Sequence, residues 1–386
     1  MSGRNARIAS TLGLAFALAT GGMLVRSVSA RDSTVLPTVP PGFEIETIAH
    51  VDRPRELAVT PSGDLLIGTS DNGVEIVPDA VGTPREAHLF ARLEDRGAAG
   101  IALGRDALYV GTYGGVWRIP YERGDETARA KATRIATVRP GGGGGHTTTS
   151  VAVGRDTLYA GVGSSCNACD EHDPTRASVV AMGLAGENPH PRATHIRNAI
   201  ALAVDPQTGA LWAGVAGQDE LEPGHPYEIF DPIGAHAGTP DYGWPTCYED
   251  HRAVDGRRDC SAQTPARVIF PAYETPIGAA FYPTAGSGSH AFPRAYRGGA
   301  FVTLHGSWHQ PPVEPRVVFV PLHGDEPVTA VNWHDPRVQW SNFLGGFQRA
   351  DGSRMGRPTG VAVAPDGSLF VADDYADAIY RIRPRS

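Results

Sequence analysis

A short pattern of apolar and polar residues recurs along most of the chain. An apolar triplet is followed by a polar turn with Asp or Gly, and then by a second apolar triplet that ends at a small residue. Alternating segments around a tight turn of this kind are typical of two antiparallel strands. Helical periodicity of useful length is absent. Clear copies are Leu57–Thr69, Ile101–Thr112, Val151–Val162, Leu202–Val215 and Val361–Asp374.

The spacing of the copies indicates how they are assembled. The first starts lie 44, 50 and 51 residues apart, and a weaker, split copy comprises Gly278–Tyr282 and Ala300–His305. This spacing is typical of four-stranded propeller blades. The count predicts an all-β, six-bladed propeller, with five blades as the nearest alternative. We expect a strand such as Phe43–Ile48 to pair with the last blade, because ring closure removes free sheet edges.

Two long insertions interrupt the later copies, roughly at Gly217–Phe270 and Pro283–Arg297. We expect both to lie on one face of the ring, where they would cover a central cavity.

Several polar residues occur at the same position relative to the repeats. His146 precedes the third copy, Arg197 and Asn198 precede the fourth, and Arg357 precedes the last, while Gly217–Asp219 follow the fourth. Since strand ends and their loops converge on the axis of a propeller, these residues are expected to meet there. For any one arginine, a solvated position or a salt bridge between blades is the more common role.

His146 follows five glycines, Gly141–Gly145. Glycine lets a backbone lie close against another surface, and loops entering a rigid scaffold often carry functional residues. A flexible linker with a solvated histidine is an equally good interpretation of this loop alone.

The N-terminus has the features of an export signal. Arg4 and Arg7 precede an uncharged stretch, Ile8–Val25, and small residues at positions 28–30 suit cleavage. We expect residues 1–30 to be a signal peptide, with a retained membrane anchor as the alternative. Residues 31–41 would be a leader, and 42–386 a single propeller domain.

The charge of the chain excludes nucleic acid as a general partner. The formal net charge is −8. Removal of residues 1–30 would take away three arginines and no acidic residue, which would change it to −11. Phosphate binding requires a basic face.

Four cysteines agree with an exported, oxidised protein. Cys247 and Cys260 flank a charged loop, and a disulfide is the simplest interpretation. Cys166 and Cys169 form a C-x-x-C that lacks the following histidine of a haem attachment site and the βαβ context of a redox pair. A zinc site of all four cysteines would need reduced thiolates, so two local disulfides are favoured.

The longest distinctive segments resemble the glucose/sorbosone dehydrogenase family, and most closely its sorbosone dehydrogenase-like branch. The similarity covers nearly all of residues 42–384, and its most specific segments are GSSCNAC, DYGWP, LHGSW and GRPTGVAVAPDGSLFVADD. The resemblance implies a six-bladed, exported quinoprotein that uses pyrroloquinoline quinone (PQQ) and Ca²⁺ to oxidise a sugar or a sugar-derived aldehyde or alcohol.

The resemblance also implies roles for individual residues. His146 would be the base that takes the hydroxyl proton while hydride passes to the quinone, because an imidazole titrates near working pH. Arg197 would hydrogen-bond the quinone carbonyl, and Asn198 would orient the same edge. Arg357 would bind a cofactor carboxylate. Trp308, and also Trp244, would offer flat faces to the planar ring.

The calcium ligands implied by the resemblance are the carbonyl oxygens of Gly217 and Gln218, with Asp219 beside them. The chain departs from close relatives in the apolar Val215–Ala216, in Ala201–Leu202 and in Thr147–Thr149 after the histidine. The first departure places the ion in question and the third some contacts to cofactor or substrate, whereas we expect the second to be tolerated.

The sequence thus predicts a periplasmic or secreted PQQ sugar dehydrogenase that passes electrons to a diffusible acceptor, since no haem motif is present. It would contact a membrane only if the N-terminal segment were retained. One alternative is a six-bladed metal-dependent lactonase, which needs several carboxylates around an axial ion. The other is a non-catalytic propeller that binds a ligand or partner.

Overall fold

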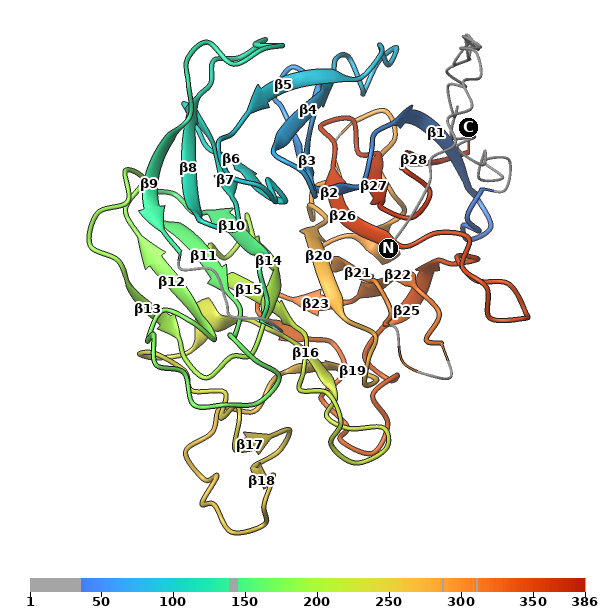
Figure 1. Cartoon of the computed structure of the whole chain (residues 1–386). Helices are drawn as coiled ribbons and strands as arrows, with labels where there is room; N and C mark the ends of the chain where they lie inside the picture. Colours follow the sequence, from blue (N-terminus) through green and yellow to red (C-terminus); the bar gives the residue numbers. More distant parts are fainter. Residues whose placement is uncertain (1–35, 139–144, 287, 308, 310–311, 386) are drawn as a thin grey trace, which may run out of the picture. The chain divides into compact units, whose positions relative to one another are not determined.

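Six four-stranded antiparallel sheets account for nearly all of the regular structure in this computed structural model (Figure 1). The structure describes residues 36–138, 145–286, 288–307, 309 and 312–385. The chain is an all-β, six-bladed propeller, as its repeats predicted. The expected signal peptide and residues 31–35 of the leader lie outside the described residues. Within these residues, no helix is long and apolar enough to cross a membrane.

The first three blades each use four consecutive strands. Blade 1 contains β2 (Pro54–Val59), β3 (Leu65–Thr69), β4 (Gly73–Val77) and β5 (His88–Arg92). Blade 2 contains β6 (Gly100–Leu103), β7 (Ala107–Gly111), β8 (Gly115–Pro120) and β9 (Thr133–Thr137). Blade 3 contains β10 (Thr149–Val153), β11 (Leu158–Val162), β12 (Ser178–Met182) and β13 (His190–Ala193).

The last three blades include the insertions and the closure. Blade 4 contains β14 (Ala199–Val204), β15 (Leu211–Val215), β16 (Glu228–Asp231) and β19 (Val268–Phe270). Blade 5 contains β20 (Pro276–Phe281), β21 (Ala300–Leu304), β22 (Arg316–Val320) and β25 (Ser341–Leu344). Blade 6 contains β26 (Pro358–Val363), β27 (Leu369–Asp373), β28 (Ala378–Pro384) and β1 (Phe43–His50).

Short elements fill the connections between these strands. They are η1 (Ile233–Ala235), η2 (Arg294–Tyr296), and the hairpins β17 (Cys247–Tyr248) with β18 (Arg252–Ala253) and β23 (Leu322–His323) with β24 (Glu326–Pro327).

The predicted closure by the N-terminal strand is confirmed. Strand β1 pairs antiparallel with β28, from Phe43 opposite Pro384 to His50 opposite Ala378. Phe43 is 3% exposed, and its ring centroid lies 4.7 Å from that of Phe292 in the apolar core between blades 5 and 6. The two ends of the propeller are therefore joined both by a strand pair and by packing.

The glycine near the end of the first repeat copies has a steric cause. A Cβ atom on Gly111 would lie 2.0 Å from the carbonyl oxygen of Thr149, on the inner strand of the next blade. Because L-residues cannot approach a neighbouring backbone this closely, glycine lets adjacent blades pack at the hub. Similar contacts with backbone or side-chain atoms of the next blade occur at Gly68, Gly161 and Gly214.

The two insertions differ in where they lie. The first contributes Gly217 and Asp219 to the lining of the central cavity described below. The second, Pro283–Arg297, joins the far end of inner strand β20 to the start of β21, and none of its described residues lines that cavity. The first insertion therefore reaches the cavity as expected, whereas the second leaves its strand at the opposite end of the ring.

Both predicted disulfides are present: Cys166 is bonded to Cys169, and Cys247 to Cys260. The one group of possible metal ligands found among the described residues is Cys166, Cys169 and Glu171. Since both of these sulfur atoms are in a disulfide, no thiolate is available there for a metal.

Candidate functional site

A polar cavity of about 430 Å³ lies where the loops of blades 3 to 6 converge. Its residues come from the segments that enter inner strands β10, β14, β20 and β26 and from those that follow second strands β15, β21 and β27. Antiparallel pairing brings these two kinds of segment to the same end of the ring. The lining comprises His146, Arg197, Asn198, Ala216, Gly217, Asp219, Glu228, Tyr273, Thr275, His305, Gly306, Ser307, Arg354, Arg357 and Tyr375.

The hydrogen bonds of His146 define its tautomer. Its Nδ1 atom lies 3.0 Å from Ser164 Oγ and 3.3 Å from the Ser164 carbonyl oxygen. The Ser164 hydroxyl donates its own hydrogen to the carbonyl oxygen of Cys166, at 2.6 Å. Both Ser164 oxygens must therefore accept from Nδ1, so in the neutral ring Nδ1 carries the hydrogen and Nε2 does not.

His146 is neutral at physiological pH. Burial, followed by the positive charge of Arg197, lowers the pKa of His146 from 6.5 to about 4. The Arg176 guanidinium donates to the carbonyl oxygens of His146 and Ser164, at 2.9 and 3.0 Å. The base candidate is thus unprotonated and held at both its ring and its backbone.

Asn198 lies against the same histidine. A Cβ atom on Gly163 would lie 2.5 Å from both Asn198 Oδ1 and His146 Cβ, so this approach requires glycine. Asn198 is 5% exposed, and its Oδ1 is buried without a hydrogen-bond partner among the described residues. An unpaired buried oxygen is costly, which marks Asn198 as a position where a ligand would supply a donor.

Every N–H of the Arg197 guanidinium is directed at an acceptor of the protein. Nε donates to the Asn167 carbonyl oxygen at 3.1 Å, and Nη2 donates to Asn167 Oδ1 at 2.8 Å and to Asp219 Oδ2 at 3.0 Å. Nη1 donates to the carbonyl oxygens of Gly217 and, at 3.4 Å, Ala216. Arg197 is 6% exposed, and burial lowers its pKa despite the nearby acids.

Glu228 is a second acid near Arg197, besides Asp219. Burial raises the pKa of Glu228 to about 7, although the backbone N–H of Gly217 and the charge of Arg197 act in the opposite direction. Its oxygens accept from the backbone N–H groups of Gly217 at 2.6 Å and Tyr273 at 3.0 Å. Glu228 therefore connects the loop after β15 to the loop before β20.

Arg357 is held by a chain of side chains that crosses three blades. Its Nη2 donates to His305 Nδ1 at 2.7 Å, so His305 Nε2 carries the hydrogen that reaches Asp374 Oδ1 at 3.0 Å. Arg55 Nη1 donates to the other oxygen of Asp374 at 2.8 Å. Burial lowers the pKa of His305 to about 4, and burial followed by nearby arginines lowers that of Arg357 to about 10.

Arg354 is a second cation beside Arg357. Its Nη2 donates to the Ser307 carbonyl oxygen at 2.7 Å, whereas its buried Nη1 has no hydrogen-bond partner among the described residues. Burial lowers the pKa of Arg354. An unpaired guanidinium nitrogen in a cavity that also contains Arg357 is suited to an anionic ligand.

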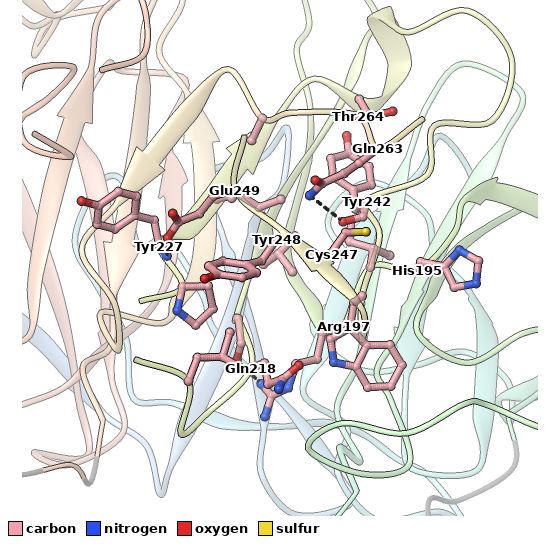
Figure 2. Close-up of a pocket in the computed structure, with 18 of the residues that line it drawn as sticks. His195, Arg197, Gln218, Tyr227, Tyr242, Cys247, Tyr248, Glu249, Gln263 and Thr264 are labelled. Atoms are coloured by element: carbon pink, nitrogen blue, oxygen red, sulfur yellow. Dashed lines mark hydrogen bonds between the residues drawn. The ribbon is translucent and has the colours of Figure 1, made fainter. Parts of the chain in front are cut away.

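A smaller pocket of about 70 Å³ adjoins the cavity, because Arg197 and Gly217 line both (Figure 2). Figure 2 shows Arg197 and Gln218 at one end of this pocket and Tyr242 and Gln263 at the other. Gln218 thus lines the small pocket and is not among the residues that line the main cavity.

Of the two tryptophans expected at the cofactor, Trp244 is not among the residues that line the main cavity. Trp244 lines the small pocket and donates its indole N–H to the Asn167 carbonyl oxygen at 3.1 Å. Trp308 lies outside the described residues.

Sequence comparisons relate part of the chain to a protein-family model and nearly all of it to a curated protein. Residues 249–385 match a family model described as TrAA12-like. A curated relative from Borreliella burgdorferi, described as an uncharacterized protein, is 22% identical, and the match covers 95% of this chain and 96% of that protein.

Solved structures provide the more informative match. The PQQ domain of pyranose dehydrogenase from Coprinopsis cinerea, in its holo form, gives a TM-score of 0.77 at 18% identity, over 91% of this chain and 97% of that chain. A calcium structure of a Trichoderma reesei family AA12 enzyme gives 0.75 at 19%, over 90% and 97%. PQQ-bound aldose sugar dehydrogenase from Streptomyces coelicolor gives 0.61 at 20%, over 90% and 100%. The chain shares the fold of these three proteins.

Within this shared fold, the structure brings together most of the residues selected from the sequence. His146, Arg197, Asn198 and Arg357 line one cavity with Gly217 and Asp219. The resemblance is confirmed at the level of the fold, and a sorbosone-type branch is not distinguished from the aldose and pyranose types.

The sequence did not identify the residues that hold the side chains of His146, Arg197 and Arg357 in place. Ser164 and Asn167 lie within or beside GSSCNAC, and His305 begins HGSW, so these motifs contained the signal. Arg354 lies three residues before Arg357, and this spacing could have suggested a paired cation. Asp374, the partner of His305, and Arg55, which donates to Asp374, could not be found in this way, since they lie 69 residues after His305 and 250 residues before it in the chain.

Proposed function

We propose that this protein is an exported oxidoreductase that oxidises a sugar hydroxyl, or the corresponding centre of a sugar-derived aldehyde or alcohol, with PQQ as hydride acceptor. One observation carries the proposal. The candidate base His146, the pair Arg197–Asn198 and Arg357 come from three separate repeats and line a single polar cavity, in a fold shared with PQQ-binding sugar dehydrogenases.

His146 is the general base in this proposal. Its Nδ1 hydrogen is held by Ser164, so Nε2 has the lone pair that accepts the substrate hydroxyl proton. Because its pKa lies near 4, the ring is already unprotonated at neutral pH. Ser164 keeps the ring from turning during this transfer, and Arg176 holds the backbone of His146 in place.

The cavity fits an anionic, planar cofactor. PQQ carries three carboxylates, and Arg354, Arg357 and Arg197 contribute three guanidinium groups to the lining. The unpaired Arg354 Nη1 and Asn198 Oδ1 provide one donor and one acceptor for a ligand. When bound, the quinone supplies the two-electron acceptor of the oxidation. To donate to it, Arg197 would give up its longest bond, to Ala216 at 3.4 Å.

The residues expected to bind Ca²⁺ do not fit a resident ion in this arrangement. The Gly217 carbonyl oxygen and an Asp219 carboxylate oxygen already accept hydrogen bonds from Arg197. A calcium ion takes six to eight oxygen ligands. Among the described residues, no three carboxylate or histidine side chains converge in the cavity. We therefore assign no step to calcium.

Export and the electron acceptor complete the proposal. Two disulfides support an oxidising compartment, so a periplasmic or secreted location with removal of residues 1–30 is proposed. Electrons would leave to a diffusible acceptor. The named neighbours act on pyranose and aldose sugars and support a sugar substrate, whereas the sorbosone type rests on the family resemblance alone.

The test is dye reduction by the exported form loaded with PQQ, over a panel of aldoses and sorbosone. His146→Ala should lower kcat by about 10²- to 10⁴-fold while PQQ still binds. The exposed His323 provides a matched control, and His323→Ala should leave kcat unchanged. Failure of PQQ to bind the wild-type protein would refute the proposal.

The two alternatives give different results in the same assay. A lactonase would hydrolyse lactones without quinone, but the carboxylates that such an enzyme requires do not converge in the described cavity. A non-catalytic propeller would neither reduce dye nor respond to His146→Ala.

A further inference from the structure

Asn167 lies inside the four-residue loop that the Cys166–Cys169 disulfide closes. Its side chain accepts from Arg197 Nη2 and from the Asp219 backbone N–H, both at 2.8 Å, and it donates to the Asp219 carbonyl oxygen at 3.0 Å. Its own carbonyl oxygen accepts from Arg197 Nε and Trp244 Nε1, each at 3.1 Å. One residue thus joins the segments before β14 and after β15 to the insertion in blade 4.

These bonds determine the plane of the Arg197 guanidinium. Nε and Nη2 lie on one edge of the guanidinium, and both donate to Asn167. Since the guanidinium is planar, two bonds along one edge set its orientation, and the opposite nitrogen, Nη1, then points at the carbonyl oxygens of Ala216 and Gly217. Asp219 alone would restrain Arg197 at a single nitrogen.

The same loop also restrains the base candidate. The carbonyl oxygen of Cys166 accepts the Ser164 hydroxyl, and Ser164 in turn accepts from His146. Neighbouring Ser165 is tied to Glu171 by its hydroxyl, at 2.9 Å. Closing this loop therefore orders the supports of both His146 and Arg197.

We propose that Asn167, held by the Cys166–Cys169 disulfide, is the positioning residue that orients the Arg197 guanidinium in the cavity. Asn167 acts through Arg197 and is not among the residues that line the cavity. The inference rests on the proposed function and extends it, because the cofactor would bind beside an Arg197 side chain that Asn167 has already oriented.

The first test changes the side chain alone. In Asn167→Ala the carbonyl oxygen remains but the acceptor for Arg197 Nη2 is lost, so PQQ affinity, measured by fluorescence titration, should fall about tenfold to a hundredfold. Asn167→Asp keeps the acceptor oxygen and should recover most of the affinity. An equal loss in both variants would contradict orientation of Arg197 by this oxygen.

A second readout does not depend on the cofactor. In ¹⁵N-arginine NMR spectra of the cofactor-free protein, the guanidinium of buried Arg197 should exchange slowly with solvent in the wild type and in Asn167→Asp, and rapidly in Asn167→Ala. Slow exchange that persists in Asn167→Ala would overturn the proposal. If the wild type shows the expected NMR behaviour but binds no PQQ, the proposed function fails while the positioning role stands.

The chain offers a matched control for the disulfide. Cys247 and Cys260 are separated by 13 positions in the sequence, and Cys166 and Cys169 by three. Because the first disulfide closes the longer loop, its loss should lower Tm more. The variant C247S/C260S is expected to show the larger fall in Tm and little change in Arg197 exchange. C166S/C169S should show the smaller fall in Tm and fast Arg197 exchange. Unchanged Arg197 exchange in folded C166S/C169S would remove the disulfide from the proposal.

Discussion

His146 Nδ1 lies 3.0 Å from Ser164 Oγ, and the hydroxyl hydrogen of Ser164 is already donated to the carbonyl oxygen of Cys166. The serine can therefore only accept from the histidine. This relationship makes Nε2 the basic nitrogen of the ring before any substrate arrives.

Ser164→Ala should weaken this tautomer preference without removing the ring. The Ser164 carbonyl oxygen, 3.3 Å from Nδ1, would remain as the weaker acceptor, so kcat should fall by about tenfold. Ser150 is a matched control: its hydroxyl is also buried, and it has no hydrogen-bond partner among the described residues. Ser150→Ala should leave kcat unchanged, and an equal loss in both variants would argue against the tautomer explanation.

Arg354→Ala and Arg357→Ala should each weaken PQQ binding by about tenfold or more, since each removes a guanidinium from the cavity. The exposed Arg349 lies on the same loop, and Arg349→Ala controls for net charge. Titration of the three variants with PQQ checks the prediction. If Arg349→Ala lost as much affinity, general attraction of an anion would replace specific binding.

His146 and His305 should contribute less to the free energy of unfolding as the pH is lowered from 6.5 to about 4. Both have folded-state pKa values near 4, below the ordinary 6.5, so in this range the unfolded chain takes up protons at these two positions that the folded chain does not. Three buried acids act in the opposite direction, because burial raises the folded-state pKa of Glu228 and Glu274 to about 7 and that of Glu56 to about 8. Urea unfolding of variants at pH 7 and pH 4.5 separates the two contributions. On going from pH 7 to pH 4.5, His305→Gln should lose less stability than the wild type, or gain more.

Asp374 contributes in a lower range. Burial would raise its pKa, but the hydrogen bond from His305 and the nearby charges, including that of Arg55, outweigh this and lower it to about 2. Its stabilising effect is present above the ordinary value of 3.8 and is lost as the pH falls toward 2. Measurements above pH 4.5 therefore exclude the contribution of Asp374.

Phe43→Ala should destabilise the closure of the ring by about 3–5 kcal/mol, the usual cost of removing a fully packed aromatic ring. Phe43 packs against Phe292 and Phe343, at 4.7 and 5.3 Å between ring centroids. Leu89, which is 37% exposed on β5, provides the control, and Leu89→Ala should cost less than about 1 kcal/mol. Chemical denaturation of both variants checks the difference, and similar losses would mean that β1 adds little to closure.

The repeats were readable from the sequence because their physical cause is local. Alternating apolar residues specify strands, and the glycine that recurs in the first four blades, as at Gly111, reflects a close contact with the next blade. Because His146, Arg197 and Arg357 occupy the same position relative to their repeats, they were predicted to meet, since equivalent strand ends converge in a closed ring. The family resemblance added roles that spacing alone could not provide.

The tertiary structure decided how these residues are held. The supports of Arg357 reach it from Asp374 and from Arg55 in the first blade, and no local pattern links segments so far apart in the chain. It also showed that Arg197 already binds two of the three groups expected to receive calcium, the Gly217 carbonyl oxygen and the Asp219 carboxylate. Sequence periodicity determines which strand ends converge, whereas hydrogen-bond partners, burial and pKa depend on side-chain positions that only the folded ring defines.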